Sequence, residues 1–209
     1  MTIHAFFRHS KPTLYRRKER IVLPGDETKD VYYINQGFVR QNILSPNGNE
    51  FTPFIFSPQT FFPLNLQSDK IPDGHYYESI TPVEIYKVPR EKLIQFLRKN
   101  PNASYAFAEQ SISYSSILLK KIESIIFDDS EHVITLSLLS LAALFGKKVR
   151  EGVIIDYWFT HQDIALISGF SREVVTKQMG KLVKKKLISY SHHLIVINDL
   201  ASLQAETNL

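Results

Sequence analysis

The sequence has no cysteine among its 209 residues. Structural disulfides, zinc sites with thiolate ligands and an iron–sulfur cluster held by cysteine are therefore excluded. Any run of about eighteen apolar residues, the length that predicts a transmembrane helix, is also missing. The amino-terminal stretch MTIHAFFRHSKPTLYRRKER becomes basic too early for a secretory signal peptide. We therefore expect a cytoplasmic protein with no membrane partner.

The residue patterns of common enzyme sites are missing as well. Histidines occur at positions 4, 9, 75, 132, 161, 192 and 193, without the spacing of a zinc or cupin site. The sequence offers no metal triad and no paired acid and base that would converge in one domain. We expect no metal, no catalytic residue and no enzymatic activity.

The first ninety residues are predicted to form short β-strands. Their apolar or alternating runs are separated by turn residues such as Pro24-Gly25-Asp26 and Asn47-Gly48. Evenly spaced short strands are typical of a β-sandwich or barrel. The predicted strands are Arg20–Leu23, Val31–Asn35, Phe38–Leu44, Phe51–Phe56, Tyr76–Ile80 and Val83–Val88.

A short helix, Pro89–Asn100, and a long one, Ala103–Phe127, are predicted next. The long helix carries two apolar stripes, so we expect it to pack on its own barrel with one and on a second copy with the other. One stripe consists of Phe107, Tyr114, Leu118 and Ile125. The other has spacings of three and four, as in a dimer seam: Tyr105, Ala108, Ile112, Ser115, Leu119, Ile122 and Ile126.

Beyond a predicted hinge at Asp128-Asp129-Ser130, the chain has the pattern of a second small domain. An apolar helix is expected over Val133–Phe145 and a strand over Val153–Phe159. Two short runs after Ile188, Ser189–His193 and Leu194–Ile197, are suited to a β-hairpin.

The stretch Thr160–Ile188 is predicted to be a helix-turn-helix. Thr160 and Asp163 have the spacing of a helix start, Gly169 allows a sharp turn, and Ser171 can cap the second helix. In that second helix the apolar face is expected to point inward, through Val175, Met179, Leu182 and Val183.

The opposite face of the second helix carries Arg172, Glu173, Thr176 and Lys177. In a major groove, arginine or lysine can donate to guanine and glutamate can accept from cytosine. Residues 147–186 hold nine Lys or Arg against four Asp or Glu, as attraction to phosphates requires. The alternatives are a helical hairpin with a solvated charged face and an ordinary basic surface.

These residues also carry a resemblance. Ser171–Lys177 is similar to the Ser-Arg-Glu-Thr-Val-Ser-Arg signature of the CRP/FNR family of bacterial transcription regulators, and Lys184–Ile188 is in register. The resemblance implies base reading by Arg172, Glu173 and Lys177. Lys177 departs from the family's arginine, and a lysine lacks its bidentate fork. We expect contacts with the DNA backbone from Thr160, His161, Gln162, Ser171, Thr176, Lys184 and His192.

The amino-terminal half extends the resemblance to most of the chain, from about residue 20 to about residue 198. Tyr32–Arg40 resembles the strand, glycine turn and strand of the cyclic-nucleotide-binding jelly roll. An α+β fold is implied: an N-terminal β jelly-roll barrel, a long dimerisation helix and a C-terminal winged helix-turn-helix. The expected boundaries are 1–100, 101–127 and 128–209.

The ligand pocket departs from the family pattern. Cyclic-AMP-binding members have a Gly-Glu motif and then an Arg-Ser or Arg-Ala pair, whereas Phe61–Leu66 and His75–Ser79 contain neither the acid nor the arginine where expected. A buried phosphate without a cationic partner is strongly disfavoured, so we do not expect cyclic AMP or cyclic GMP. A pocket for an aromatic or hydrophobic molecule is one hypothesis, and a barrel filled by its own side chains is the other. The proposed lining is Phe62, Leu64, Asn65, Tyr76 and Tyr77.

His75 lies where some family members hold haem, but no second axial ligand is evident, so we do not expect haem. We predict a homodimer that binds a near-palindromic site in double-stranded DNA, controlled by a small molecule other than cyclic AMP in the barrel. The alternative is an effector-independent regulator with a vestigial barrel. RNA polymerase is a candidate partner. The effector, the target genes and the choice between activation and repression are not encoded in these patterns.

Overall fold

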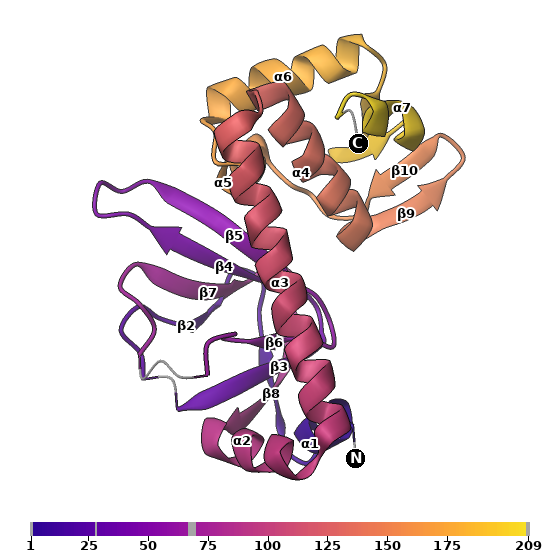
Figure 1. The fold of residues 1–209 in the computed structure, drawn as a ribbon. Helices are drawn as coiled ribbons and strands as arrows, with labels where there is room; N and C mark the ends of the chain where they lie inside the picture. The colour runs from indigo at the N-terminus through magenta and orange to yellow at the C-terminus, as the bar shows by residue number, and fades with distance from the viewer. Residues whose placement is uncertain (1, 28, 67–69, 208–209) are drawn as a thin grey trace. The chain divides into compact units, whose positions relative to one another are not determined.

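The computed structural model describes residues 2–27, 29–66 and 70–207. The chain divides into two compact units, Met1–Leu119 and Lys120–Leu209. The division falls inside the long helix α3 (Pro101–Phe127), which contributes residues to both units (Figure 1). None of the helices within the described ranges is long and apolar enough to cross a membrane.

Unit 1 is built on two antiparallel four-stranded sheets. Both contain strands that are distant in sequence, as a jelly roll requires. The first sheet has the order β1 (Pro12–Tyr15), β8 (Val83–Pro89), β3 (Asp30–Gln36) and β6 (Phe61–Phe62). The second has the order β2 (Arg20–Val22), β7 (His75–Ser79), β4 (Val39–Leu44) and β5 (Glu50–Phe56).

Aromatic side chains fill much of the space between these sheets. Phe62 stacks on Tyr77 with ring centroids 4.7 Å apart, and Phe56 lies 5.6 Å from Phe62. All three rings are buried in one cluster with Ile34 and Ile85. Such close-packed rings stabilise the barrel mainly through the apolar area that they remove from water.

Three helices pack on unit 1: α1 (Ile3–Phe7), α2 (Arg90–Lys99) and the first part of α3. Phe6 of α1 stacks on Phe96 of α2 at 4.2 Å. From α3, Phe107 stacks on Phe61 at 4.2 Å, and Tyr114 lies 5.2 Å from Phe56. Part of the stripe predicted to face the barrel therefore does so.

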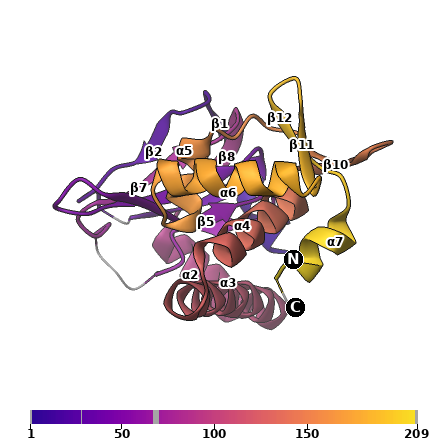
Figure 2. The ribbon, with the colours of Figure 1, turned by 90° about the horizontal axis from the view of Figure 1, so that it is seen from above.

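Unit 2 begins with the end of α3 and contains a small sheet of order β11-β12-β10-β9. Helices α4, α5 and α6 contact one another, and the β11–β12 hairpin follows α6 (Figure 2). Together the two units confirm the predicted α+β class. The elements are α4 (Ser130–Phe145), β9 (Gly146–Val149), β10 (Gly152–Ile155), α5 (His161–Ser168), α6 (Arg172–Lys184), β11 (Ile188–Ser191), β12 (Leu194–Ile197) and α7 (Leu200–Ala205).

The predicted strand Val153–Phe159 is wrong in its second half. Strand β10 ends at Ile155, where its pairing with β9 ends. The next residues turn sharply, because the amide of Tyr157 donates to the carbonyl of Ile155 at 2.7 Å. Phe159 is buried and lies 5.0 Å from the ring of Phe145. This aromatic run therefore anchors the start of α5 by side-chain packing rather than by strand pairing.

Candidate DNA-binding surface

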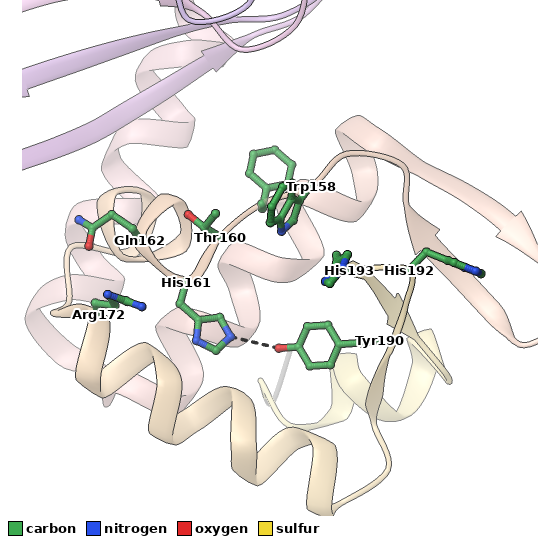
Figure 3. Close-up of a pocket in the computed structure, with 9 residues that line it drawn as sticks. Trp158, Thr160, His161, Gln162, Arg172, Tyr190, His192 and His193 are labelled. Atoms are coloured by element: carbon green, nitrogen blue, oxygen red, sulfur yellow. Dashed lines mark hydrogen bonds between the residues drawn. The ribbon is translucent and has the colours of Figure 1, made fainter.

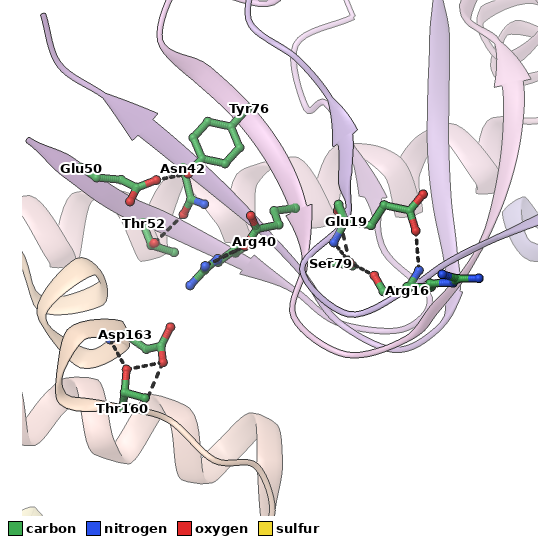
Figure 4. Close-up of polar contacts among 11 residues, drawn as sticks. Arg16, Glu19, Arg40, Asn42, Glu50, Thr52, Tyr76, Ser79, Thr160 and Asp163 are labelled. Atoms are coloured by element: carbon green, nitrogen blue, oxygen red, sulfur yellow. Dashed lines mark hydrogen bonds and ion pairs between the residues drawn. The ribbon is translucent and has the colours of Figure 1, made fainter. Parts of the chain in front are cut away.

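Local hydrogen bonds define the helix-turn-helix as the sequence predicts. Thr160 and Asp163 form a reciprocal capping box, in which the Asp163 carboxylate accepts from the Thr160 amide at 2.9 Å (Figure 4). Gly169 ends α5 with φ of 80°, a left-handed conformation that favours glycine. The Ser171 hydroxyl accepts from the Val174 amide at the start of α6. These contacts fix the turn between the two helices.

The inward face of α6 contains three of the four predicted residues. Val175, Met179 and Leu182 are buried, whereas Val183 is 39% exposed. Leu182 faces the core, and Val183, about 100° further round the helix, lies at the edge of the buried face. Gln178 joins the buried side and donates to the Ser130 hydroxyl of α4 at 2.9 Å. This packing leaves the first turn of α6 available at the surface.

The three predicted base-reading side chains lie together on the exposed side of α6. Arg172, Glu173 and Lys177 are all exposed. The pKa of the Glu173 carboxyl is lowered, first by a hydrogen bond from its own backbone amide and then by the Ser171 hydroxyl. Glu173 is therefore an anion at neutral pH and can only accept hydrogen bonds. Two cationic donors and one acceptor suit the edges of guanine and cytosine.

An open hollow of about 660 Å³ lies between the start of α6 and the β11–β12 hairpin (Figure 3). Five of its lining residues are among the predicted DNA contacts: Thr160, His161, Gln162, Arg172 and His192. The other four are Trp158, Phe159, Tyr190 and His193. The sequence prediction placed His193 in the wing turn but missed Trp158, Phe159 and Tyr190, although a tryptophan directly before a predicted helix start is a sign of an interface.

Trp158 and Tyr190 present half-exposed aromatic rings in this hollow. Trp158 is 53% exposed and Tyr190 is 47% exposed. The Trp158 ring lies 5.5 Å from the His193 ring. His192 and His193 form the two-residue tip of the hairpin, with φ of 49° and 67°. We call the β11–β12 hairpin the wing.

Part of the basic excess is used within unit 2. Lys185 and Lys181 donate to the Glu131 carboxylate at 2.9 and 3.1 Å. Lys147 pairs with Asp156 at 2.5 Å. The number of lysines therefore overstates the positive charge that faces DNA. Lys184, predicted to contact the DNA backbone, is exposed near the end of α6.

The five proposed effector-pocket residues do not share one surface of the barrel. Phe62 and Tyr77 belong to the buried cluster, and Leu64 packs against it. Successive strand residues point to opposite faces, so Tyr76 turns away from Tyr77. Asn65 is exposed. The structure thus places only part of the predicted lining inside the barrel.

Polar residues occupy the face of β4 and β7 that Tyr76 shares (Figure 4). Tyr76 donates to the Glu50 carboxylate, and Arg40 pairs with Glu78 at 2.7 Å. His75 lies on the opposite face of β7, the face of Tyr77, where it accepts from the Gln41 side chain at 3.0 Å, and burial lowers the pKa of its imidazole. A neutral histidine and a paired arginine do not fit a cyclic phosphate, which needs an available cation.

The predicted dimer seam of α3 is exposed on the single chain. Ile112 and Leu119 are 66% and 67% exposed, and Ile126 is 64% exposed. Ile122, Ala108 and Ser115 of the same stripe are also exposed. Large apolar side chains in such a row are typical of surfaces that are covered by a partner.

Comparison with known domains agrees with these two units. Residues 12–100 match the cyclic nucleotide-binding domain, and residues 136–206 match the Crp-like helix-turn-helix domain. The chain belongs to the CRP/FNR family. Members of this family are DNA-binding transcription regulators, and this chain is one of them rather than an enzyme.

Several characterised members cover nearly the whole chain. The global nitrogen regulator of Nostoc sp. is 29% identical, over 92% of this chain and 87% of that protein. The cAMP-activated global transcriptional regulator CRP of Salmonella typhimurium is 25% identical, over 94% of this chain and 93% of that protein. The structure of FixK2 from Bradyrhizobium japonicum matches with a TM-score of 0.81 at 16% identity, over 94% and 96% of the two chains. The last likeness supports the fold.

Proposed function

We propose that this family member is a homodimer that reads a near-palindromic DNA site through Arg172, Glu173 and Lys177. The observation that carries the proposal is their common exposure on α6, beside a hollow that contains five predicted contacts. Pairing along the α3 seam would supply the second recognition helix. In two-fold helix-turn-helix dimers the half-sites are about 34–36 Å apart.

Arg172 and Lys184 give this proposal a matched pair of variants. Arg172→Ala is expected to weaken binding to the preferred duplex by about 1–3 kcal/mol and to relax the preference at one base pair. Lys184→Ala, which removes a cation further along α6, is expected to weaken preferred and random duplexes alike and to lower the salt dependence. Equal losses on both duplexes for Arg172→Ala would contradict base reading.

For the barrel we propose control by a small molecule other than cyclic AMP. The cyclic nucleotide-binding fold supports this role, and the pairing of Arg40 with Glu78 and the lowered pKa of His75 argue against a phosphate ligand. The ligand would need different affinities for two arrangements of the dimer, since only a differential affinity shifts their populations. The rings of Phe56, Phe62 and Tyr77 already fill part of the barrel interior. This observation favours the alternative, a regulator that acts without an effector.

The test is selection from a randomised duplex library by the purified full chain at fixed salt, with and without a bacterial small-molecule extract. Enrichment of a near-palindrome only with extract supports control by an effector. Enrichment of the same site without extract supports the effector-independent alternative. If no duplex is enriched by folded, dimeric protein, the base-reading proposal is wrong.

A further inference from the structure

His161 lines the DNA-binding hollow, yet both of its ring nitrogens are bonded within the chain. Figure 3 shows the bond to Tyr190. Its Nδ1 lies 2.9 Å from the Thr176 hydroxyl of α6. Its Nε2 lies 3.2 Å from the Tyr190 hydroxyl of the wing. A side chain from the start of α5 therefore links the recognition helix to the wing. This placement differs from the direct phosphate contact expected from the sequence.

The bonding around Thr176 determines which nitrogen carries the proton. The Thr176 hydroxyl donates its only hydrogen to the Arg172 carbonyl at 2.8 Å. It can therefore only accept from His161, which requires a hydrogen on Nδ1. In the neutral ring Nε2 is then an acceptor, and the Tyr190 hydroxyl donates to it. The hydrogen bonds run in one direction, from Tyr190 through His161 and Thr176 to the backbone of Arg172.

We propose that His161 is a positioning residue, which holds the wing and the first turn of α6 in one arrangement so that both meet the same DNA duplex. This inference rests on the proposed DNA-reading function and deepens it. The side chain of Arg172 is the part proposed to read DNA. Its backbone carbonyl accepts the last of the hydrogen bonds that begin at Tyr190 on the wing. Loss of the link allows the wing and Arg172 to move independently, which lowers the affinity for a preferred site more than for random DNA.

The surroundings keep the His161 ring in the required state. Burial, and then the nearby Arg172 guanidinium, lower the pKa of His161. The other titratable groups around the hollow are the Tyr190 phenol of β11 and the imidazoles of His192 and His193 at the wing tip. A protonated ring would have a hydrogen on both nitrogens and could no longer accept from Tyr190. The link is therefore complete at neutral pH and is reorganised in acid.

The first test needs no DNA. Nitrogen NMR of ring-labelled protein at neutral pH is expected to show His161 with Nδ1 protonated and Nε2 bare. Thr176→Val removes the acceptor and is expected to shift the ring toward the Nε2-protonated form, which donates to Tyr190. A wild-type ring that is protonated on Nε2 would overturn the proposal, whatever the protein's DNA preference.

The second test measures affinity for the selected duplex and for random DNA. Tyr190→Phe removes only the hydroxyl, and His161→Asn keeps an amide where Nδ1 lies but cannot reach the wing. Each is expected to lower affinity for the selected duplex about three- to tenfold, as for one net hydrogen bond, with little change on random DNA. The double variant is expected to lose no more affinity than the single variant that binds the selected duplex more weakly. Both substitutions break the same row of hydrogen bonds, so their effects do not add.

Additive losses would overturn the proposal by showing that His161 and Tyr190 act independently. An equal loss on random DNA with a lower salt dependence for His161→Asn would show instead that His161 contacts phosphate. Thermal unfolding of each variant verifies that the fold is intact. If no duplex is enriched in the first place, the proposed function fails, while the NMR measurement still decides the protonation and bonding of His161.

Discussion

The wing tip provides a test in which stability and DNA binding are expected to change in opposite directions. His192 and His193 join paired residues Ser191 and Leu194 with φ of 49° and 67°. Positive φ at both central residues defines a type I′ turn, for which Asn-Gly is the preferred pair. A left-handed conformation costs an ordinary L-residue about 1–2 kcal/mol, although histidine tolerates it better than most. The double variant His192→Asn, His193→Gly places the preferred pair at this turn and is expected to stabilise unit 2.

Two contributions set the expected gain in unfolding free energy. Relief of the backbone is worth about 1 kcal/mol, the lower end of that range, because histidine is replaced rather than a branched residue. Loss of the His193 ring beside Trp158, at 5.5 Å, offsets about 0.5 kcal/mol. The net gain is about 0.5 kcal/mol. Binding to both selected and random DNA is expected to fall about two- to tenfold, because the His192 imidazole proposed to contact phosphate is gone.

Urea unfolding followed by the fluorescence of Trp158, the only tryptophan in the chain, reports on this unit. Filter binding or anisotropy at one salt concentration gives the two DNA affinities. His192→Asn alone is the control that keeps the Trp158 contact. A less stable double variant would refute the backbone argument, and unchanged DNA affinity would refute the phosphate contact.

Two further predictions concern the dimer seam and the base of the recognition helix. Leu119→Glu places a charge on the exposed seam and is expected to yield monomers by light scattering, whereas Ser113→Glu, on another exposed face of α3, leaves the dimer intact. Hydrogen bonds from Lys185 and then Lys181 lower the pKa of Glu131. The ionised carboxylate therefore stabilises the fold above its unfolded pKa of about 4.3. This stabilisation is lost as the pH falls through the lower pKa of the folded state. Glu131→Gln is expected to reduce stability at pH 7 and to make stability depend less on pH in acid. Urea unfolding midpoints measured at several pH values test this, and an unchanged pH profile would contradict it.

The helix-turn-helix could be predicted in detail because its determinants are local. The capping residues Thr160 and Ser171 and the turn residue Gly169 each act within four positions of their own place in the chain. The buried pattern of α6 follows from helical periodicity, except at Val183. The exposed face of Arg172, Glu173 and Lys177 follows from the same periodicity. Local rules thus sufficed for the core of this site.

The remainder depends on contacts between distant segments. Strands β1 and β6 and helix α1 have two to five residues each, too few for a periodic pattern. Tyr190 enters the site only because the wing folds back, 29 residues after His161. The pairing of Lys181 and Lys185 with Glu131 spans about fifty residues, which charge counts along the sequence cannot reveal. Tertiary contacts of this kind are set by topology rather than by local propensity.

Strand β9 has a consequence for how the protein behaves at high concentration. It lies at the edge of its sheet, and its residues Gly146–Val149 are all exposed. An open edge can recruit a strand from another molecule, which is a common route to aggregation. Lys148 places a cation on this edge, and Lys147 beside it is paired with Asp156. An incoming copy would bring the same cation against Lys148, and this like charge is expected to oppose edge-to-edge pairing between molecules in solution.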